Sequence, residues 1–80
     1  MNPQFDYAYL RGFIIEHFKN VENFAKFLDI GTTATYDRLG NRVPFTQREI
    51  DKVATQAANR KLSAEEVSNL FFTHKIRKTV

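Results

Sequence analysis

The sequence predicts an all-α fold, a compact domain of five short helices followed by a short C-terminal strand or arm. Apolar residues recur at helical spacing in successive short segments, and helix-capping or helix-breaking residues separate these segments. The length of 80 residues suits one domain, residues 1–80, whose eight Phe and three Tyr supply large apolar side chains for its core. The helices are expected at about 7–18, 21–28, 33–39, 47–59 and 64–71.

The first expected helix, 7–18, has a broad apolar stripe. Asp6 is a suitable N-cap because its carboxylate can accept hydrogen bonds from the first backbone N–H groups. Gly12 in the middle costs about 1 kcal/mol relative to Ala, so we expect it to mark a close crossing by another helix. The residues that form the stripe are Tyr7, Leu10, Phe13, Ile14 and Phe18.

Residues 20–39 have the pattern of two short helices joined by a tight turn. Asn20 can cap the first helix, Asp29-Ile30-Gly31 form the turn with Asp29 tolerating a left-handed conformation, and Thr32 can cap the second. Thr35 and Leu39 mark the inner face of the second helix, where a buried Thr needs a carbonyl to accept its hydroxyl proton. This spacing predicts a helix-turn-helix unit, in which Thr32, Thr33, Tyr36 and Asp37 face outward.

Strong local signals define the remaining helices. Gly40-Asn41 should end the helix at 33–39, and Thr46-x-x-Glu49 and Ser63-x-x-Glu66 are capping boxes that begin the last two helices. Capping accounts for these Glu residues, so we assign them no acid–base chemistry. Each box has apolar residues placed as a hydrophobic staple, Phe45 with Ile50 and Leu62 with Val67.

The C-terminal segment, 72–80, alternates between two sets of side chains with a period of two, as a strand or extended arm does. It also carries the densest basic cluster, Lys75, Arg77 and Lys78. A single strand needs a partner edge. It can pair with its own domain, pair with a second copy, or stay frayed.

Composition argues for a binding module and against an enzyme, a cofactor site or a small-molecule substrate. The chain has no Cys, and two isolated His are too few for a zinc site. Three Gly cannot form a phosphate-binding loop, and no recognised nucleophile arrangement is present. We expect no membrane span, because runs of Phe, Ile, Leu or Val, such as 13–15, are at most three residues long, and the N-terminus lacks the pattern of a signal peptide.

Charge is unevenly distributed along the chain. Residues 1–40 contain four Lys/Arg and five Asp/Glu, a net charge of −1, whereas residues 41–80 contain eight and four, a net charge of +4. The basic side chains thus lie mainly outside the expected outward face of the helix-turn-helix unit. Segments that flank the unit could still contact a polyanion such as DNA.

Five segments together resemble the small Cro-type helix-turn-helix regulators of temperate phages of Gram-positive bacteria. These segments are DYAYLRGFIIEHF, NFAKFLDI, RLGNRVPFTQREI, LSAEEV and FFTHKIRK, and they span 6–78. The resemblance implies a lambda repressor-like domain in the host bacterial cytoplasm, encoded beside a lysogenic repressor. It implies double-stranded operator DNA as the partner, and a homodimer as a frequent state.

The resemblance also implies which residues bind DNA. Thr32, Thr33, Tyr36 and Asp37 would face base edges, where hydroxyls can bond to bases and Asp can accept from cytosine. Four further residues would contact phosphates, namely Asn20, Asn23, Arg38 and Arg42.

A second interpretation keeps the fold and changes the partner. The acidic side chains around the motif could meet the basic DNA-binding face of the cognate phage repressor, which would make the protein an anti-repressor or modulator of repression. The residues expected at that contact are Glu22, Asp29, Tyr36 and Asp37.

Overall fold

The computed structural model describes residues 4–74 and contains five α-helices in this range. They are α1 (Ala8–Phe18), α2 (Val21–Leu28), α3 (Thr32–Leu39), α4 (Gln47–Gln56) and α5 (Ala64–Phe71). The all-α prediction is confirmed, with helix positions close to those expected. None of these described helices has the length and apolar character required to cross a bilayer.

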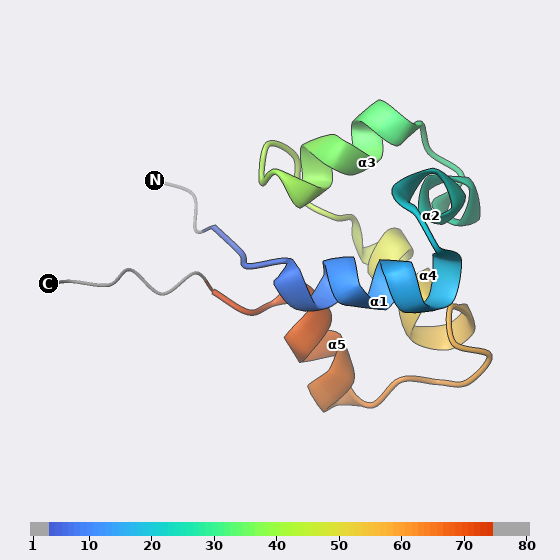
Figure 1. The fold of residues 1–80 in the computed structure, drawn as a ribbon. Helices are drawn as coiled ribbons and strands as arrows, with labels where there is room; N and C mark the ends of the chain where they lie inside the picture. The colour runs from blue at the N-terminus through green and yellow to red at the C-terminus, as the bar shows by residue number, and fades with distance from the viewer. Residues whose placement is uncertain (1–3, 75–80) are drawn as a thin grey trace, which may run out of the picture.

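The helices are arranged around α1, which crosses the middle of the molecule with α2 and α3 on one side and α5 on the other (Figure 1). α1 packs against α2 and α5, α2 packs against α3, and α4 packs against α5. The helix-turn-helix pair therefore lies at the opposite side of α1 from α5, which leaves α3 at the outside of the molecule.

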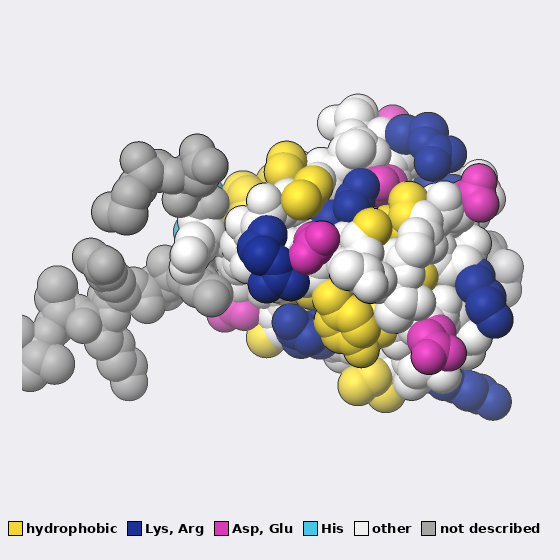
Figure 2. Space-filling view, turned by 90° about the horizontal axis from the view of Figure 1, so that it is seen from above, with side chains coloured by type: hydrophobic (Ala, Val, Ile, Leu, Met, Phe, Trp, Pro, Cys, Tyr) yellow, Lys and Arg dark blue, Asp and Glu magenta, His cyan; other side chains and the backbone are white. Residues whose placement is uncertain are grey.

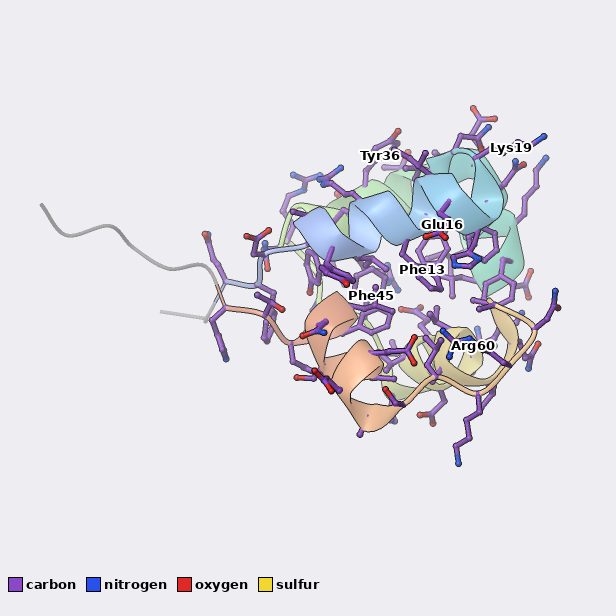
Figure 3. The ribbon with its side chains drawn as sticks, turned by 60° about the horizontal axis from the view of Figure 1, so that its bottom comes forward. Phe13, Glu16, Lys19, Tyr36, Phe45 and Arg60 are labelled. Carbon is purple, nitrogen blue, oxygen red and sulfur yellow. The ribbon has the colours of Figure 1, made fainter. Side chains whose placement is uncertain are left out.

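The core is rich in aromatic rings. Tyr7 and Phe45 make an edge-to-face contact with ring centroids 5.5 Å apart, and Phe45 makes a second with Phe71 at 5.2 Å. Phe45 lies between α1 and α5 (Figure 3), so this chain of rings joins the N-terminal segment, the α3–α4 connection and α5. The other buried apolar residues are Leu10, Ile14, Phe24, Ala25, Leu28, Leu39, Ile50, Val53, Leu62 and Leu70.

Both predicted capping boxes are confirmed. Thr46 accepts the backbone N–H of Glu49, whose side chain accepts the N–H of Thr46, and Ser63 and Glu66 make the same reciprocal pair. The staple residue Phe45 is buried in the core together with Ile50. The short-range pattern thus located the starts of α4 and α5.

Three predicted helix ends differ from the structure. The N-cap of α1 is Tyr7, and Asp6 acts from one position earlier, accepting the N–H of Ala8 at 2.9 Å. α3 begins at Thr32 itself, because the extended backbone of Gly31 occupies the cap position without a side-chain bond. α4 ends at Gln56 rather than about 59, because the chain enters a turn with Asn59 at φ 57°.

The expectation that Gly12 marks a close helix crossing is wrong. A Cβ atom placed at Gly12 would meet nothing within 4 Å. Gly12 lies on the exposed side of α1, so no helix within the described residues crosses there.

The end of α3 is joined to both ends of the described chain. Asn41, at φ 63°, takes the left-handed conformation after α3, and its side-chain amide pairs with the backbone of Phe5, accepting from N at 2.9 Å and donating to O at 3.0 Å. Phe5 in turn forms an antiparallel bridge with His74, and the N–H of Asp6 donates to the Thr73 carbonyl at 2.6 Å. The C-terminal segment therefore starts by pairing with its own domain. The rest of the predicted strand, 75–80, lies outside the described residues.

Candidate functional site: the outer face of the helix-turn-helix

A left-handed residue sets the angle between α2 and α3. Asp29 has φ 61° and ψ 43°, and its N–H reaches the carbonyls of Ala25 and Lys26. The N–H of Ile30 also donates to Ala25 at 3.1 Å, which satisfies carbonyls left free at the end of α2. The predicted left-handed turn at Asp29 is confirmed. It reverses the chain so that α3 packs across α2.

Thr35 fixes the inner face of α3. Its side chain is fully buried, and its hydroxyl donates to the Gly31 carbonyl at 3.0 Å, one turn earlier in the helix. This is the bond expected for a buried Thr at this position, because an unpaired buried hydroxyl would be costly. With Thr35 and Leu39 buried, the opposite side of α3 faces outward.

Thr33 and Tyr36 are the most accessible of the predicted base-facing residues. Thr33 is exposed, and the Tyr36 side chain is 48% exposed, on the side of the molecule away from Arg60 (Figure 3). Thr32 and Asp37 are half-buried. The hydroxyl groups of Thr33 and Tyr36, about one helical turn apart, can thus both contact a partner that binds the outer face of α3.

Both Asn residues predicted to contact phosphate are engaged in bonds of the α1–α2 connection: Asn20 caps the start of α2, and Asn23 bonds back to the end of α1. Asn20 accepts the N–H of Asn23 through its side-chain oxygen at 2.8 Å. The side-chain amide of Asn23 donates to the Phe18 carbonyl at 2.8 Å. These bonds fix the connection from α1 to α2, and they leave the amide group of Asn20 as a donor toward a ligand.

Arg38 was expected at a phosphate, but its side chain turns inward. Nε and Nη2 donate to the two carboxylate oxygens of Glu49 at 2.8 and 3.0 Å, and Nη1 donates to the Ala34 carbonyl at 3.0 Å. The two side chains are only 13% and 4% exposed. Arg38 therefore attaches α3 to the start of α4, and this position of Arg38 corrects the sequence-based expectation.

Sequence reasoning explained Glu49 by capping alone and missed its second role. Burial acts to raise the pKa of Glu49, but hydrogen bonds from Arg38 and the Thr46 backbone outweigh it and hold the pKa below its ordinary value. Glu49 is thus the anion that balances Arg38 inside the fold. No spacing rule connects residues of two different helices, so the sequence held no signal for this pair.

Asp37 and Arg42, both predicted site residues, are brought together at the surface. Nε of Arg42 donates to Oδ1 of Asp37 at 2.9 Å, and its side chain remains 64% exposed. The guanidinium also lies 3.5 Å from the Tyr36 carbonyl. The outer end of α3 therefore carries a neutral ion pair, not a free cation.

The acidic residues of the alternative contact surface are accessible. Glu22, in the first turn of α2, and Asp29, at its end, are both exposed. Within residues 4–74, neither carboxylate forms an ion pair. They could therefore meet basic groups of a protein partner.

Two exposed cations beside α2 were not among the predicted site residues. Lys19 follows α1 (Figure 3) and Lys26 lies on α2, and both are exposed. The face seen from the α3 side shows basic and acidic side chains interspersed, without a continuous basic area (Figure 2). The helical periodicity of α2 could have identified Lys26, because it places this residue on the side opposite the buried stripe.

No protein-family model and no curated protein matches this chain.

Proposed function

We propose that the protein binds operator DNA through the outer face of α3 and acts as a Cro-like transcriptional regulator in a phage lysis–lysogeny switch, in the host bacterial cytoplasm. The observation that carries this proposal is the exposure of Thr33 and Tyr36 on a helix held outward by the Asp29 turn and the buried Thr35. Hydroxyls on a helix that enters the major groove can bond to base edges.

Phosphate contacts must then come mainly from cations that are not already paired inside the fold. Lys19 and Lys26 are exposed beside α2, and the amide of Asn20 lies at its start. Such contacts fix the position of a helix on the duplex without specifying the sequence. Arg42 could contribute only by leaving Asp37.

A second candidate function is favoured by the state of the two guanidinium groups. Arg38 is paired with Glu49 and Arg42 with Asp37, while Glu22 and Asp29 are exposed. The exposed carboxylates of Glu22 and Asp29 could meet the basic DNA-binding face of a phage repressor. The protein would then be an anti-repressor that modulates repression by protein–protein contact.

Fluorescence anisotropy with labelled promoter DNA tests the first proposal. We expect tight binding to the promoter, weaker binding to an unrelated duplex, and a loss of affinity of about tenfold or more between 50 and 200 mM salt. Thr33→Ala and Tyr36→Ala should weaken promoter binding, whereas Thr55→Ala, at an exposed position of α4, should not. Equal weak binding to both duplexes would reject the operator proposal.

Asp37→Asn separates the two candidates because they predict opposite signs. Removing this carboxylate frees Arg42 and removes a negative charge next to DNA, so DNA affinity should rise several-fold. Under the repressor-binding proposal, the same change should weaken the protein complex by several-fold. Asp51→Asn is the matched control, because it makes the same charge change at an exposed position of α4.

A further inference from the structure

Gly40 follows α3 without using the conformational freedom of glycine. Its φ of −88° and ψ of 7° are those of the third residue of a type I turn, which most residues adopt. None of the glycines in residues 4–74 has a positive φ, and the left-handed residue of this turn is the next one, Asn41. A glycine at position 40 is therefore explained by the space around it and not by its backbone conformation.

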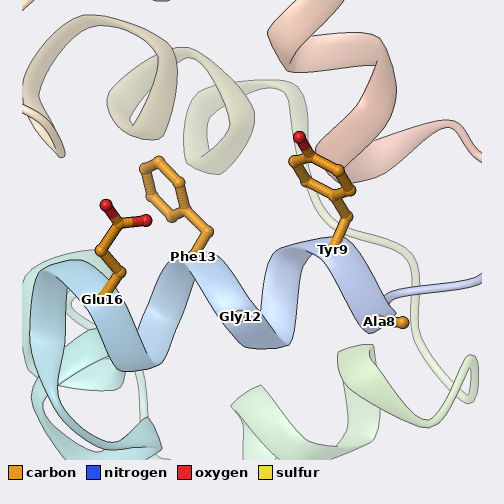
Figure 4. A pocket seen from close by; sticks show the side chains of 5 residues that line it. All are labelled: Ala8, Tyr9, Gly12, Phe13 and Glu16. Atoms are coloured by element: carbon orange, nitrogen blue, oxygen red, sulfur yellow. The ribbon is translucent and has the colours of Figure 1, made fainter.

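That space is filled by the guanidinium of Arg42. A Cβ atom placed on Gly40 would lie 2.8 Å from Nη1 of Arg42 and 3.3 Å from its Cζ, so Arg42 occupies the place of an alanine methyl group. Gly12 provides a contrast. A Cβ placed there meets nothing within 4 Å, and Figure 4 shows Gly12 among the residues that line a hollow on α1.

The turn after α3 brings Arg42 back against that helix. The backbone N–H of Arg42 donates to the Asp37 carbonyl at 2.9 Å, and Asn41 is held by its two bonds to the backbone of Phe5. The guanidinium then reaches the Asp37 carboxylate at 2.9 Å and lies 3.5 Å from the Tyr36 carbonyl, at the negative end of the α3 dipole. The backbone therefore places the Asp37–Arg42 pair, which does not depend on two freely rotating side chains.

We propose that the Asp37–Arg42 pair, seated on Gly40, withholds Arg42 from DNA phosphates and so lowers the sequence-independent part of DNA affinity. This inference rests on the proposed binding of DNA through α3. The Arg42 side chain is 64% exposed, so a phosphate can reach it once Asp37 is displaced. A phosphate contact has the same strength on every sequence, and withholding it leaves less protein on the many non-operator sites of a genome. Gly40 acts as a positioning residue, because its missing side chain gives the guanidinium its place.

Nuclear magnetic resonance of the free protein tests the pair without DNA. The Nε–H of Arg42 should exchange with water about twofold or more slowly than that of Arg48, because a surface ion pair protects it modestly. Arg48 is the reference because it is exposed on α4 and forms no ion pair within the described part of the chain. In Gly40→Ala the added methyl group displaces the guanidinium, so the two exchange rates should become similar.

Fluorescence anisotropy with promoter DNA and an unrelated duplex then measures the effect on binding. Gly40→Ala should bind both duplexes about threefold or more tightly at 50 mM salt, because it frees one arginine for a phosphate. The slope of log K against log salt concentration should become steeper by about 0.9, the value for one additional phosphate contact. The gain should be equal on the two duplexes, since a phosphate contact does not read sequence.

Matched variants show whether the gain comes from Arg42. Arg42→Gln in the Gly40→Ala background should remove the gain. Gly12→Ala makes the same substitution where the added methyl group displaces nothing, so it should change neither the exchange of the Arg42 Nε–H nor DNA affinity. Asp37→Asn opens the pair without altering the turn, and Arg42→Gln should remove part of its gain as well. Circular dichroism shows whether each variant is folded.

The possible outcomes separate this proposal from operator binding. Equal Nε–H exchange of Arg42 and Arg48 in the wild type would overturn the proposal, as would a Gly40→Ala gain that is missing or that persists after Arg42→Gln. Promoter preference without an Arg42-dependent gain would support operator binding and reject the role of the pair. An Arg42-dependent gain on both duplexes without promoter preference would do the reverse. Binding of neither duplex by any variant would reject both.

Discussion

Two Arg–Glu pairs in this chain share their local chemistry and differ in their surroundings. In each, the Glu belongs to a capping box and both its oxygens accept from one guanidinium, Glu49 from Arg38 and Glu66 from Arg60. The first pair is 13% and 4% exposed and joins two helices; the second is 58% and 40% exposed and spans six residues. Because burial differs while the bond geometry is shared, we expect the fold to depend far more on the Arg38–Glu49 pair than on the Arg60–Glu66 pair.

The largest effect is expected from Arg38→Ala. It leaves the Glu49 carboxylate buried without its cation, which typically costs about 3–5 kcal/mol. An 80-residue domain has a total stability of only about 4–12 kcal/mol, so the variant should be largely or partly unfolded in urea titrations at low denaturant. Loss of DNA binding in Arg38→Ala would therefore report on folding and not on a phosphate contact.

The double variant Arg38→Met with Glu49→Leu sharpens this explanation. Replacing both charges by apolar side chains leaves no unpaired buried ion, so we expect it to be more stable than either single variant. Loss of the Thr46 cap bond from Glu49 should keep it somewhat below the wild type. A double variant less stable than both singles would contradict the role given to burial.

Acid should weaken both pairs. The hydrogen bond from Arg60 and the Ser63 backbone lower the pKa of Glu66 from 4.5 to about 2, and the pKa of Glu49 is also below its ordinary value. Between pH 4.5 and about 2, Glu66 is protonated in the unfolded chain but not in the folded chain. The stability that Glu66 contributes is therefore present above about pH 4.5 and is lost as the pH falls toward 2. Urea midpoints measured between about pH 6 and 2 should fall over this window.

Arg60→Ala should have the smallest effect. Its partner Glu66 stays hydrated and keeps its bond to the Ser63 backbone, so the free energy of unfolding at neutral pH should change far less than in Arg38→Ala. Added salt should reduce the remaining difference from the wild type. The acid-dependent loss of stability should become shallower, because the first cause of the low Glu66 pKa is gone. If Arg60→Ala lowered the free energy of unfolding as much as Arg38→Ala does, burial would not explain the difference between the two pairs.

The sequence predicted features that depend on neighbouring residues. The two capping boxes, the left-handed Asp29 and the inward hydroxyl of Thr35 all involve groups within four or five positions, whose geometry the helix itself fixes. The inner faces of α2 and α3 followed from periodicity for the same reason.

Features that depend on distant residues were not predicted. Arg38 meets Glu49 across two helices, and Asn41 meets Phe5 at a separation of 36 residues. Periodicity shows whether a side chain faces inward, but it does not show which polar group of another segment that side chain will contact. An Arg on a predicted recognition helix was therefore assigned to a phosphate when its partner was a carboxylate of the same domain.

The link between Asn41, Phe5 and Thr73 also has a kinetic consequence. The bond from Asp6 to Thr73 closes a loop of nearly the whole described chain, and loop closure over such a length has a large entropic cost before the helices have packed. We expect these contacts to form after the transition state for folding. The end of α3 is then the last part of the outer face to become fixed, and the first to loosen when the chain begins to unfold.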